Sequence, residues 1–211
     1  MLEAFYQDED ALSKAGQQTI TNTQQLAQKA DQIKHNHKAY PLDGYGHVKS
    51  FSKNLHELAQ LIKLDAGVQM AVVEMDGWDH HDAQSYIYPS MISGLSRALS
   101  AFYNDLHRFH NRLTIVTMSE FGRRLKANRN KGTDHGHAGL SMVLGGQVKG
   151  GRMYGNWPGL ASAQLNRGVD LEVTTDYRSI LQTILKKRMK AKQLDLIFPG
   201  FNSSTNLDFL S

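Results

Sequence analysis

Three short apolar runs, separated by amphipathic stretches, dominate the hydrophobic pattern of the chain. The runs VQMAVVEM (68–75), RLTIVTM (112–118) and LSMVLGG (140–146) contain the β-branched and apolar residues typical of buried strands. Apolar positions recur at helical spacing over 48–64 and 91–110. A strand, a helix and a second strand at this spacing form a βαβ unit, which predicts a parallel sheet.

The chain of 211 residues is long enough for one domain with a sizeable core. We therefore predict a single α/β domain over 1–211, with three α/β/α layers and a mainly parallel sheet. Residues 1–66 are expected to form a helical N-terminal part and 67–198 the sheet-forming part. The tail, 199–211, reads as a solvated coil.

Composition and charge narrow the function classes. With 40% hydrophobic and 21% charged residues the chain is ordinary for a globular protein, and its net charge of +4 permits an anionic ligand without predicting nucleic-acid binding. There is no cysteine, so any metal must be held by nitrogen and oxygen ligands. No apolar run reaches the length of about 18 residues that a membrane span needs, and the acidic amino terminus does not resemble an export signal.

A polar segment, DGWDHHD (76–82), follows the first apolar run. In an extended backbone Asp79 and His81 would face one side and His80 the other. A carboxylate and an imidazole two residues apart suit one half of a metal site. Asp76 and His80 are the alternative pair if the segment turns, and a polar loop before a helix is the alternative to any site.

Glu120 stands where the second apolar run ends. A carboxylate is costly to desolvate there unless a cation or hydrogen-bond donors accompany it. Glu120 is therefore either a metal ligand or the ion-pair partner of Arg123 or Arg124.

Two histidines flank a glycine shortly before the third apolar run. His135 and His137 can supply one or two ligands, and Asp134 can orient an imidazole from behind. A turn explains Asp134 and Gly136 but not both histidines. Because ligands gather beyond the carboxyl ends of parallel strands, we expect the three motifs to converge at one sheet edge. The expected metal ligands are Asp79, His81, Glu120, His135 and His137.

These motifs resemble those of the DUF1501 family, which is placed with sulfatases and phosphopentomutases in the alkaline-phosphatase-like superfamily. The matching stretches are GWDHH (77–81), MSEFGR (118–123), GTDHGH (132–137), GGRMYGNWPGL (150–160) and TTDYRSIL (174–181). His80 stands where the family has Thr, and Phe121 stands where relatives in the superfamily carry a ligating His.

The resemblance implies metal-dependent hydrolysis of a phosphate or sulfate ester, with Zn²⁺, Mn²⁺ or Mg²⁺ as the cofactor and a small anionic ester as the substrate. Arg123 is the candidate anion clamp. Family members resemble chains about twice as long, so the resemblance also implies that this chain corresponds to a C-terminal half, incomplete at its N-terminus. No residue is assigned as the nucleophile.

The alternative function is non-catalytic: a metal-stabilised binding module, or an inactive portion that needs a partner chain. Self-association or a partner chain would then replace the N-terminal half. The family resembles exported, periplasmic proteins, although no export signal is expected in this chain.

Overall fold

The computed structural model describes residues 6–7, 9–30, 40–43, 46–201 and 207–211. This part of the chain divides into two compact units. One comprises 1–77 with 90–106, and the other comprises 78–89 with 107–211. That the chain acts as a single domain over 1–211 stays a prediction. None of the helices within the described ranges combines the length and the apolar character that crossing a membrane requires.

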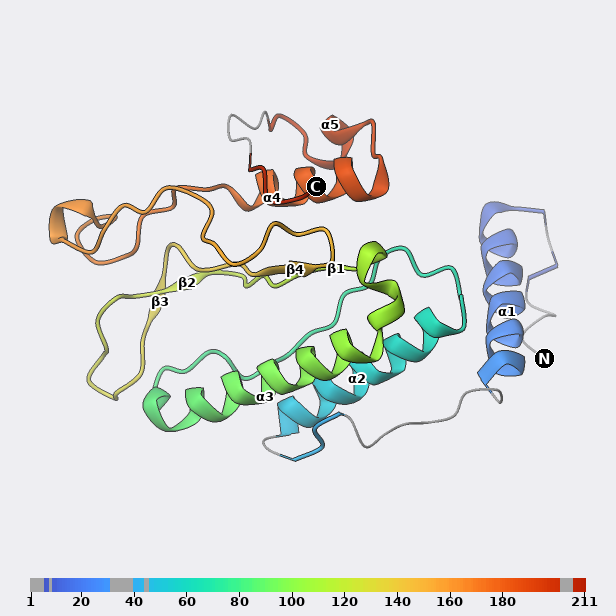
Figure 1. The fold of residues 1–211 in the computed structure, drawn as a ribbon, viewed down its shortest axis with the longest axis horizontal. Coiled ribbons are helices and arrows are strands. Elements are labelled where there is room, and N and C mark those ends of the chain that lie inside the picture. Colours follow the sequence, from blue (N-terminus) through green and yellow to red (C-terminus); the bar gives the residue numbers. More distant parts are fainter. Residues whose placement is uncertain (1–5, 8, 31–39, 44–45, 202–206) are drawn as a thin grey trace. The chain divides into compact units, whose positions relative to one another are not determined.

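The described helices of the first unit are α1, α2 and most of α3. α1 spans Ala11–Ala30 and α2 spans Gly46–Lys63. α3 (Gln84–Asp105) begins earlier than the expected helix, and its part from Ser90 onward belongs to this unit. α2 and α3 lie side by side (Figure 1). Their buried side chains include Val48, Phe51, Leu55, Ala59, Met91, Ala98, Leu99 and Phe102.

A glycine allows α2 and α3 to approach closely. A Cβ built at Gly94 would lie 2.5 Å from Cγ2 of Val48, closer than real Cβ contacts come. Tyr40 joins the loop before α2 to α3, since its hydroxyl donates to Asp105 Oδ2 at 2.9 Å and Lys63 forms an ion pair with the same carboxylate. Burial first, and then the Asp105 carboxylate, raise the pKa of Tyr40 far above its usual range.

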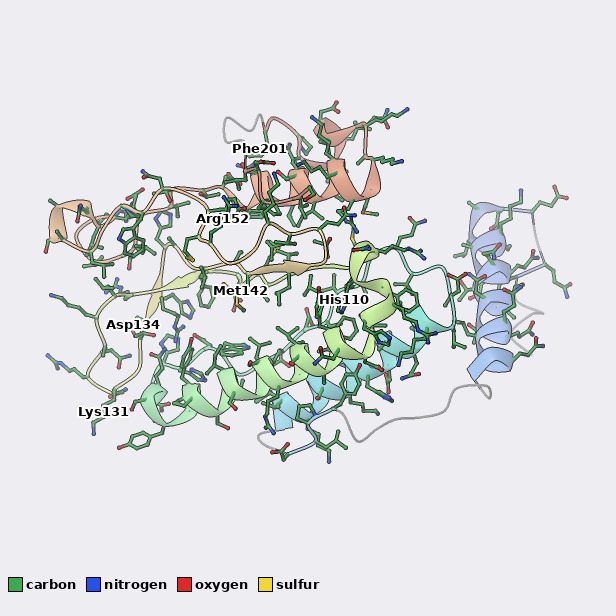
Figure 2. All side chains as sticks on the ribbon, viewed as in Figure 1. His110, Lys131, Asp134, Met142, Arg152 and Phe201 are labelled. Atoms are coloured by element: carbon green, nitrogen blue, oxygen red, sulfur yellow. The ribbon has the colours of Figure 1, made fainter. Side chains whose placement is uncertain are left out.

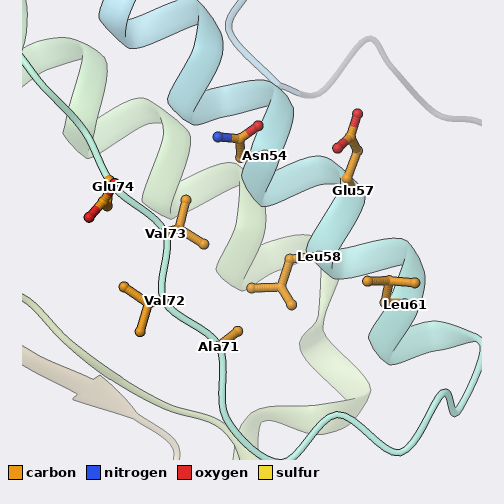
Figure 3. Close-up of a pocket in the computed structure, with 8 residues that line it drawn as sticks. All are labelled: Asn54, Glu57, Leu58, Leu61, Ala71, Val72, Val73 and Glu74. Carbon is orange, nitrogen blue, oxygen red and sulfur yellow. The ribbon is translucent and has the colours of Figure 1, made fainter. Parts of the chain in front are cut away.

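The strand predicted at 68–75 is wrong. The segment is extended but is not part of any sheet among the described residues. On one side it borders a groove of about 500 Å³, shared with Asn54, Glu57, Leu58 and Leu61 of α2 (Figure 3). An apolar run indicates that a segment can form a strand. Whether it pairs depends on a partner strand that cannot be identified from the local sequence.

The predicted three-layer α/β/α fold with a parallel sheet is also wrong, because the second unit contains two small antiparallel pairs. β1 (Thr114–Val116) pairs with β4 (Val143–Gly145), and β2 (Gly122–Arg123) pairs with β3 (His135–Gly136). A parallel pair needs a crossover, usually a helix. The connection from β1 to β4 contains the β2–β3 pair instead of a helix, so the chain folds back antiparallel.

The C-terminal end of the chain is packed, so the prediction of a solvated tail is wrong for its last five residues. Leu207, Phe209 and Leu210 are buried, and Leu210 is fully enclosed. Val143, Val148, Tyr154, Ile180 and Ile184 pack against this cluster. Of these, Ile180 and Ile184 belong to α4 (Tyr177–Met189). The second unit also contains the short helices η3 (His107–Arg112), η4 (Ser162–Gln164) and α5 (Leu194–Ile197).

Asp176 begins α4, and its charge makes part of the stability depend on pH. Its carboxylate accepts the N–H of Arg178 at 2.9 Å as an N-cap and also binds the Arg178 guanidinium. The hydrogen bond from Arg178 holds the pKa of Asp176 below its usual range. Because the pKa of Asp176 is lower in the folded state than in the unfolded state, where it is about 3.9, the ionised carboxylate stabilises the folded protein at pH values above 3.9. This stabilisation is lost as the pH falls through the pKa of the folded state.

We therefore expect Asp176→Asn, which keeps a neutral cap, to be less stable than the wild type at pH 7. The difference in the free energy of unfolding between the two proteins should decrease as the pH falls from about 5 to about 3. Asp176→Ala should cost about 1 kcal/mol at pH 7. Urea unfolding at several pH values measures both effects. A gap between wild type and Asp176→Asn that does not change with pH would contradict the role of the charge.

Candidate metal centre

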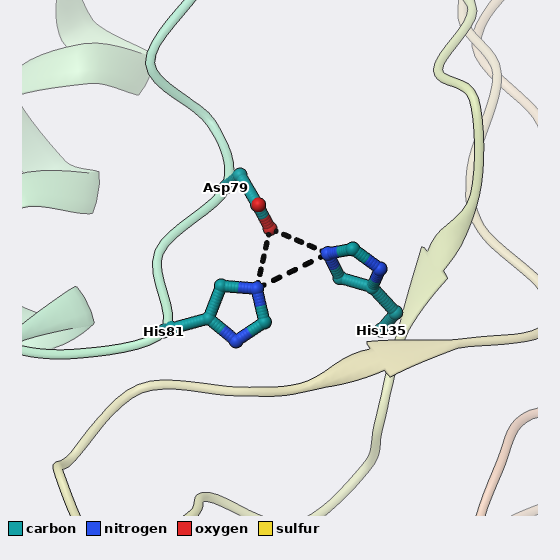
Figure 4. Close-up of side chains that lie close together, drawn as sticks. All are labelled: Asp79, His81 and His135. Carbon is teal, nitrogen blue, oxygen red and sulfur yellow. Dashed lines mark hydrogen bonds and ion pairs between the residues drawn. The ribbon is translucent and has the colours of Figure 1, made fainter.

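Three side chains in the second unit form a compact triangle of ligand atoms. Asp79 Oδ1 lies 3.0 Å from His81 Nε2 and 2.9 Å from His135 Nε2, and the two imidazole nitrogens are 3.1 Å apart (Figure 4). Asp79 and His81 lie on the segment before α3, and His135 begins β3. All three side chains are about half exposed, so an ion could reach them from solvent.

The triangle fits the ligand spacing of a divalent cation. A tetrahedral ion with bonds of about 2.0–2.1 Å separates its ligands by about 3.3–3.4 Å. The three side chains need to move by only a few tenths of an ångström to reach this spacing. Two imidazoles and one carboxylate are the donor set of catalytic zinc sites, which keep a fourth position open. Imidazole nitrogen also favours zinc over magnesium.

Asp134 and Asn128 both contact His81. His81 Nδ1 lies 3.4 Å from Asp134 Oδ1, which favours a proton on Nδ1 and leaves Nε2 as a ligand. Asn128 Nδ2 donates to the same Asp134 oxygen at 2.9 Å and to the carbonyl of His81 at 2.8 Å. First the Asn128 hydrogen bond and then His81 keep the pKa of Asp134 below its usual range. Asp134 is labelled beside β3 in Figure 2.

Arg123 contacts the same oxygen of Asp79 that faces the two imidazoles. Its Nη1 donates to Asp79 Oδ1, and its Nε donates to Thr133 Oγ1 at 3.1 Å. Its buried Nη2 has no hydrogen-bond partner among the described residues. The Arg123 guanidinium, and after it the hydrogen bond with His135, hold the pKa of Asp79 below its usual range. Asp79 is therefore ionised and able to bind a cation at neutral pH.

Phe121 fixes the plane of the His135 ring. The two rings stack with centroids 3.8 Å apart and an interplanar angle of 24°. In this chain Phe121 thus packs against one of the three candidate ligands. The β2–β3 pair places Arg123 opposite His135, which brings the guanidinium and the imidazole to one end of the site.

Gly132 allows the loop before β3 to pass against the backbone of His81. A Cβ at Gly132 would lie 2.2 Å from the carbonyl carbon of His81 and 2.4 Å from the nitrogen of Asp82. Backbone atoms cannot move aside as a flexible side chain can. We expect Gly132→Ala to separate the two segments of the site and to destabilise the protein by about 1–3 kcal/mol.

Urea unfolding and metal titration test this expectation. Gly150→Ala is the matched control, because its Cβ would meet nothing closer than 4.0 Å. Equal effects of the two substitutions would show that close packing at Gly132 does not hold the site together.

The remaining predicted ligands lie outside the triangle. Glu120 and His137 are exposed and do not join the group of ligand atoms formed by Asp79, His81 and His135. His80 is buried, and neither of its ring nitrogens has a hydrogen-bond partner among the described residues. Asp76 is exposed and, like His80, is not among the ligand atoms of the triangle. His80 is buried whereas its two neighbours are exposed, as the expected separation of His80 from Asp79 and His81 requires. The backbone is not extended here, since the N–H groups of His80 and His81 donate to the carbonyls of Trp78 and Asp79 in two tight turns.

Two supporting residues were missed by the sequence analysis. Asn128 orders the loop, since its Oδ1 accepts from the nitrogens of Asn130 and Gly132, at 3.0 and 3.1 Å. Gln84 accepts a hydrogen bond from Thr133 Oγ1 at 2.9 Å. The stretch NRNKG, in which an Asn precedes a Gly by four residues, is a turn signal that could have identified Asn128. No local signal identifies Gln84, because its partner is 49 residues away.

Comparison with known protein families identifies the chain. It matches the family model described as a protein of unknown function (DUF1501) over residues 4–196. The chain belongs to the DUF1501 family. Neither the curated proteins nor the solved structures gave a match. The triangle of Asp79, His81 and His135 is built from the GWDHH and GTDHGH motifs of this DUF1501 protein.

Proposed function

We propose that this DUF1501 protein binds one divalent cation through Asp79, His81 and His135 and hydrolyses an anionic ester, of phosphate or sulfate. The observation that carries the proposal is the triangle of ligand atoms, with sides of 2.9, 3.0 and 3.1 Å. Two imidazole nitrogens this close repel each other when neither is protonated, and a cation between them relieves the repulsion. Zn²⁺ suits this donor set best, followed by Mn²⁺ and Mg²⁺.

The residues around the triangle supply positioning and charge. When bound, the cation supplies Lewis acidity toward the ester oxygen and a water of lowered pKa. Asp134 holds the His81 proton at Nδ1, and Phe121 keeps the His135 ring in place. Arg123 would share Asp79 Oδ1 with the cation. The positive charge of its guanidinium beside this oxygen would help to attract the ester anion.

Hydrolysis of p-nitrophenyl phosphate and p-nitrophenyl sulfate tests the proposal. The chain is first dialysed against EDTA and then given Zn²⁺, Mn²⁺ or Mg²⁺. We expect saturable hydrolysis of one ester to depend on the added metal and to disappear in His135→Ala. His137→Ala, which changes an exposed histidine outside the triangle, should keep the activity. Undiminished hydrolysis in EDTA would overturn the proposal.

A second candidate function follows from where the ligands come from. His81 and His135 are 54 residues apart, and their segments already meet through the Asp82–Lys131 β-bridge and the hydrogen bond from the Thr133 N–H to the His80 carbonyl at 3.0 Å. A cation would add a further cross-link between these two segments. The cation could thus stabilise a binding module without catalysis. In that case Zn²⁺ at about 100 times its Kd should raise the free energy of unfolding by about 2.7 kcal/mol, with no ester turnover.

A further inference from the structure

Asn128 uses the whole hydrogen-bonding capacity of its side-chain amide. Its Nδ2 donates to Asp134 Oδ1 at 2.9 Å and to the carbonyl of His81 at 2.8 Å. Its Oδ1 accepts from the backbone N–H groups of Asn130 and Gly132, at 3.0 and 3.1 Å. An amide offers two N–H donors and two oxygen lone pairs. Because two acceptors lie on one side and two donors on the other, the amide fits in one orientation.

The backbone of the turn keeps this amide in place. The N–H of Asn128 donates to the carbonyl of Gly132 at 2.8 Å, and the carbonyl of Asn128 accepts from the N–H of Lys131 at 3.2 Å. The turn is joined to the segment before α3 by the N–H of Ala83, which donates to the carbonyl of Asn130 at 3.1 Å. All of these residues belong to the second unit. The two donors of Asn128 therefore have a fixed place between the two segments that form the triangle.

These donors contact two groups that determine where His81 Nε2 points. Asp134 Oδ1, which accepts from Asn128, lies 3.4 Å from His81 Nδ1 and contacts the imidazole ring. The second acceptor is the carbonyl of His81 itself, so Asn128 also holds the backbone that carries the ring. Groups that orient a metal ligand in this way change metal affinity by about 10–100-fold.

We infer that Asn128 is a positioning residue of the metal centre, whose amide N–H groups hold Asp134 and the backbone of His81 so that Nε2 faces the other two ligand atoms. This inference rests on the proposed function, because it concerns the affinity of the triangle for a cation. Aspartate has the same shape as asparagine, but it would place an oxygen without a proton against two acceptors. The donor half of the amide thus positions the ligand, whereas the acceptor half orders the turn.

Asn128→Asp separates these two roles, because it keeps an acceptor for the turn and removes both donors. We expect the Kd for Zn²⁺, measured by isothermal titration on the EDTA-treated chain, to rise about 10–100-fold. Asn130→Asp is the matched control. It adds the same charge to the same turn, at an exposed side chain that forms no hydrogen bond within the described ranges. Its Kd should stay within about threefold of the wild type.

Asn128→Ser is a second variant, in case Asn128→Asp does not fold. Serine also provides an oxygen that suits a turn, but it has no amide donors to reach Asp134 and the His81 carbonyl. We expect the same rise in Kd for Zn²⁺. A Kd within about threefold of the wild type in a folded variant overturns the inference.

A double-mutant cycle distinguishes positioning from a loosened turn. If Asn128 acts through Asp134, Asn128→Asp should raise the Kd by a factor at least about threefold smaller in an Asp134→Ala background than in the wild type. Equal factors in the two backgrounds overturn the positioning role and leave the proposed function in place. A wild-type chain that binds no Zn²⁺ overturns the proposed function, and this inference with it. Zn²⁺ binding without ester turnover would contradict the proposed hydrolysis alone, since these titrations contain no ester.

Discussion

His135→Ala should weaken Zn²⁺ binding by more than about 100-fold. Substitution of residues that merely support a ligand costs about 10–100-fold in affinity, and His135 would itself be one of three ligands. Its Nε2 closes the triangle with Asp79 and His81, so its loss leaves two donors and an ion mostly held by water. Isothermal titration with Zn²⁺ on the EDTA-treated chain measures the change.

His137→Ala is the matched control for this substitution. His137 follows β3 by one residue and is similarly exposed, but it takes no part in the triangle. We expect its affinity for Zn²⁺ to stay within about twofold of the wild type, since isolated exposed side chains contribute little. If both variants lost the same affinity, the ion would be bound by a general cluster of histidines and not by the triangle.

Local patterns in the sequence predicted the helices and the geometry of single motifs. The spacing of Asp79, His80 and His81 predicted that His80 lies apart from its two neighbours, and His80 is buried while they are exposed, although two tight turns stand in place of the extended backbone. The helical spacing of α2 likewise predicted its buried face. Such features depend on neighbours within a few residues, and the sequence specifies those directly.

Features that depend on distant partners were not predictable in this way. The segment Val68–Met75 has the composition of a buried strand, yet it has no strand partner among the described residues. The direction of β4 relative to β1 depends on the connection between them, which contains no crossover helix. Glu120 was expected in the site on the assumption of a parallel sheet whose strand ends converge. Without that sheet, nothing brings Glu120 to the triangle.

Leu210→Ala should destabilise the second unit by about 2–5 kcal/mol, because it removes a fully enclosed side chain and leaves a cavity. The end of the chain is also fixed through its backbone. Leu210 forms a β-bridge with Val148, and the N–H of Lys149 donates to the carbonyl of Phe209 at 2.8 Å. These bonds fix the position of the Leu210 backbone. The surrounding side chains therefore have little freedom to fill the cavity that Leu210→Ala leaves.

The two tryptophans of the chain, Trp78 and Trp157, both belong to the second unit, so tryptophan fluorescence during urea unfolding reports on that unit. Leu196→Ala is the control, because Leu196 is 68% exposed and its truncation should cost less than about 0.5 kcal/mol. Similar losses for the two variants would mean that the last residues are not part of the core. A large loss for Leu210→Ala alone would establish that Leu210 is part of the hydrophobic core of the second unit.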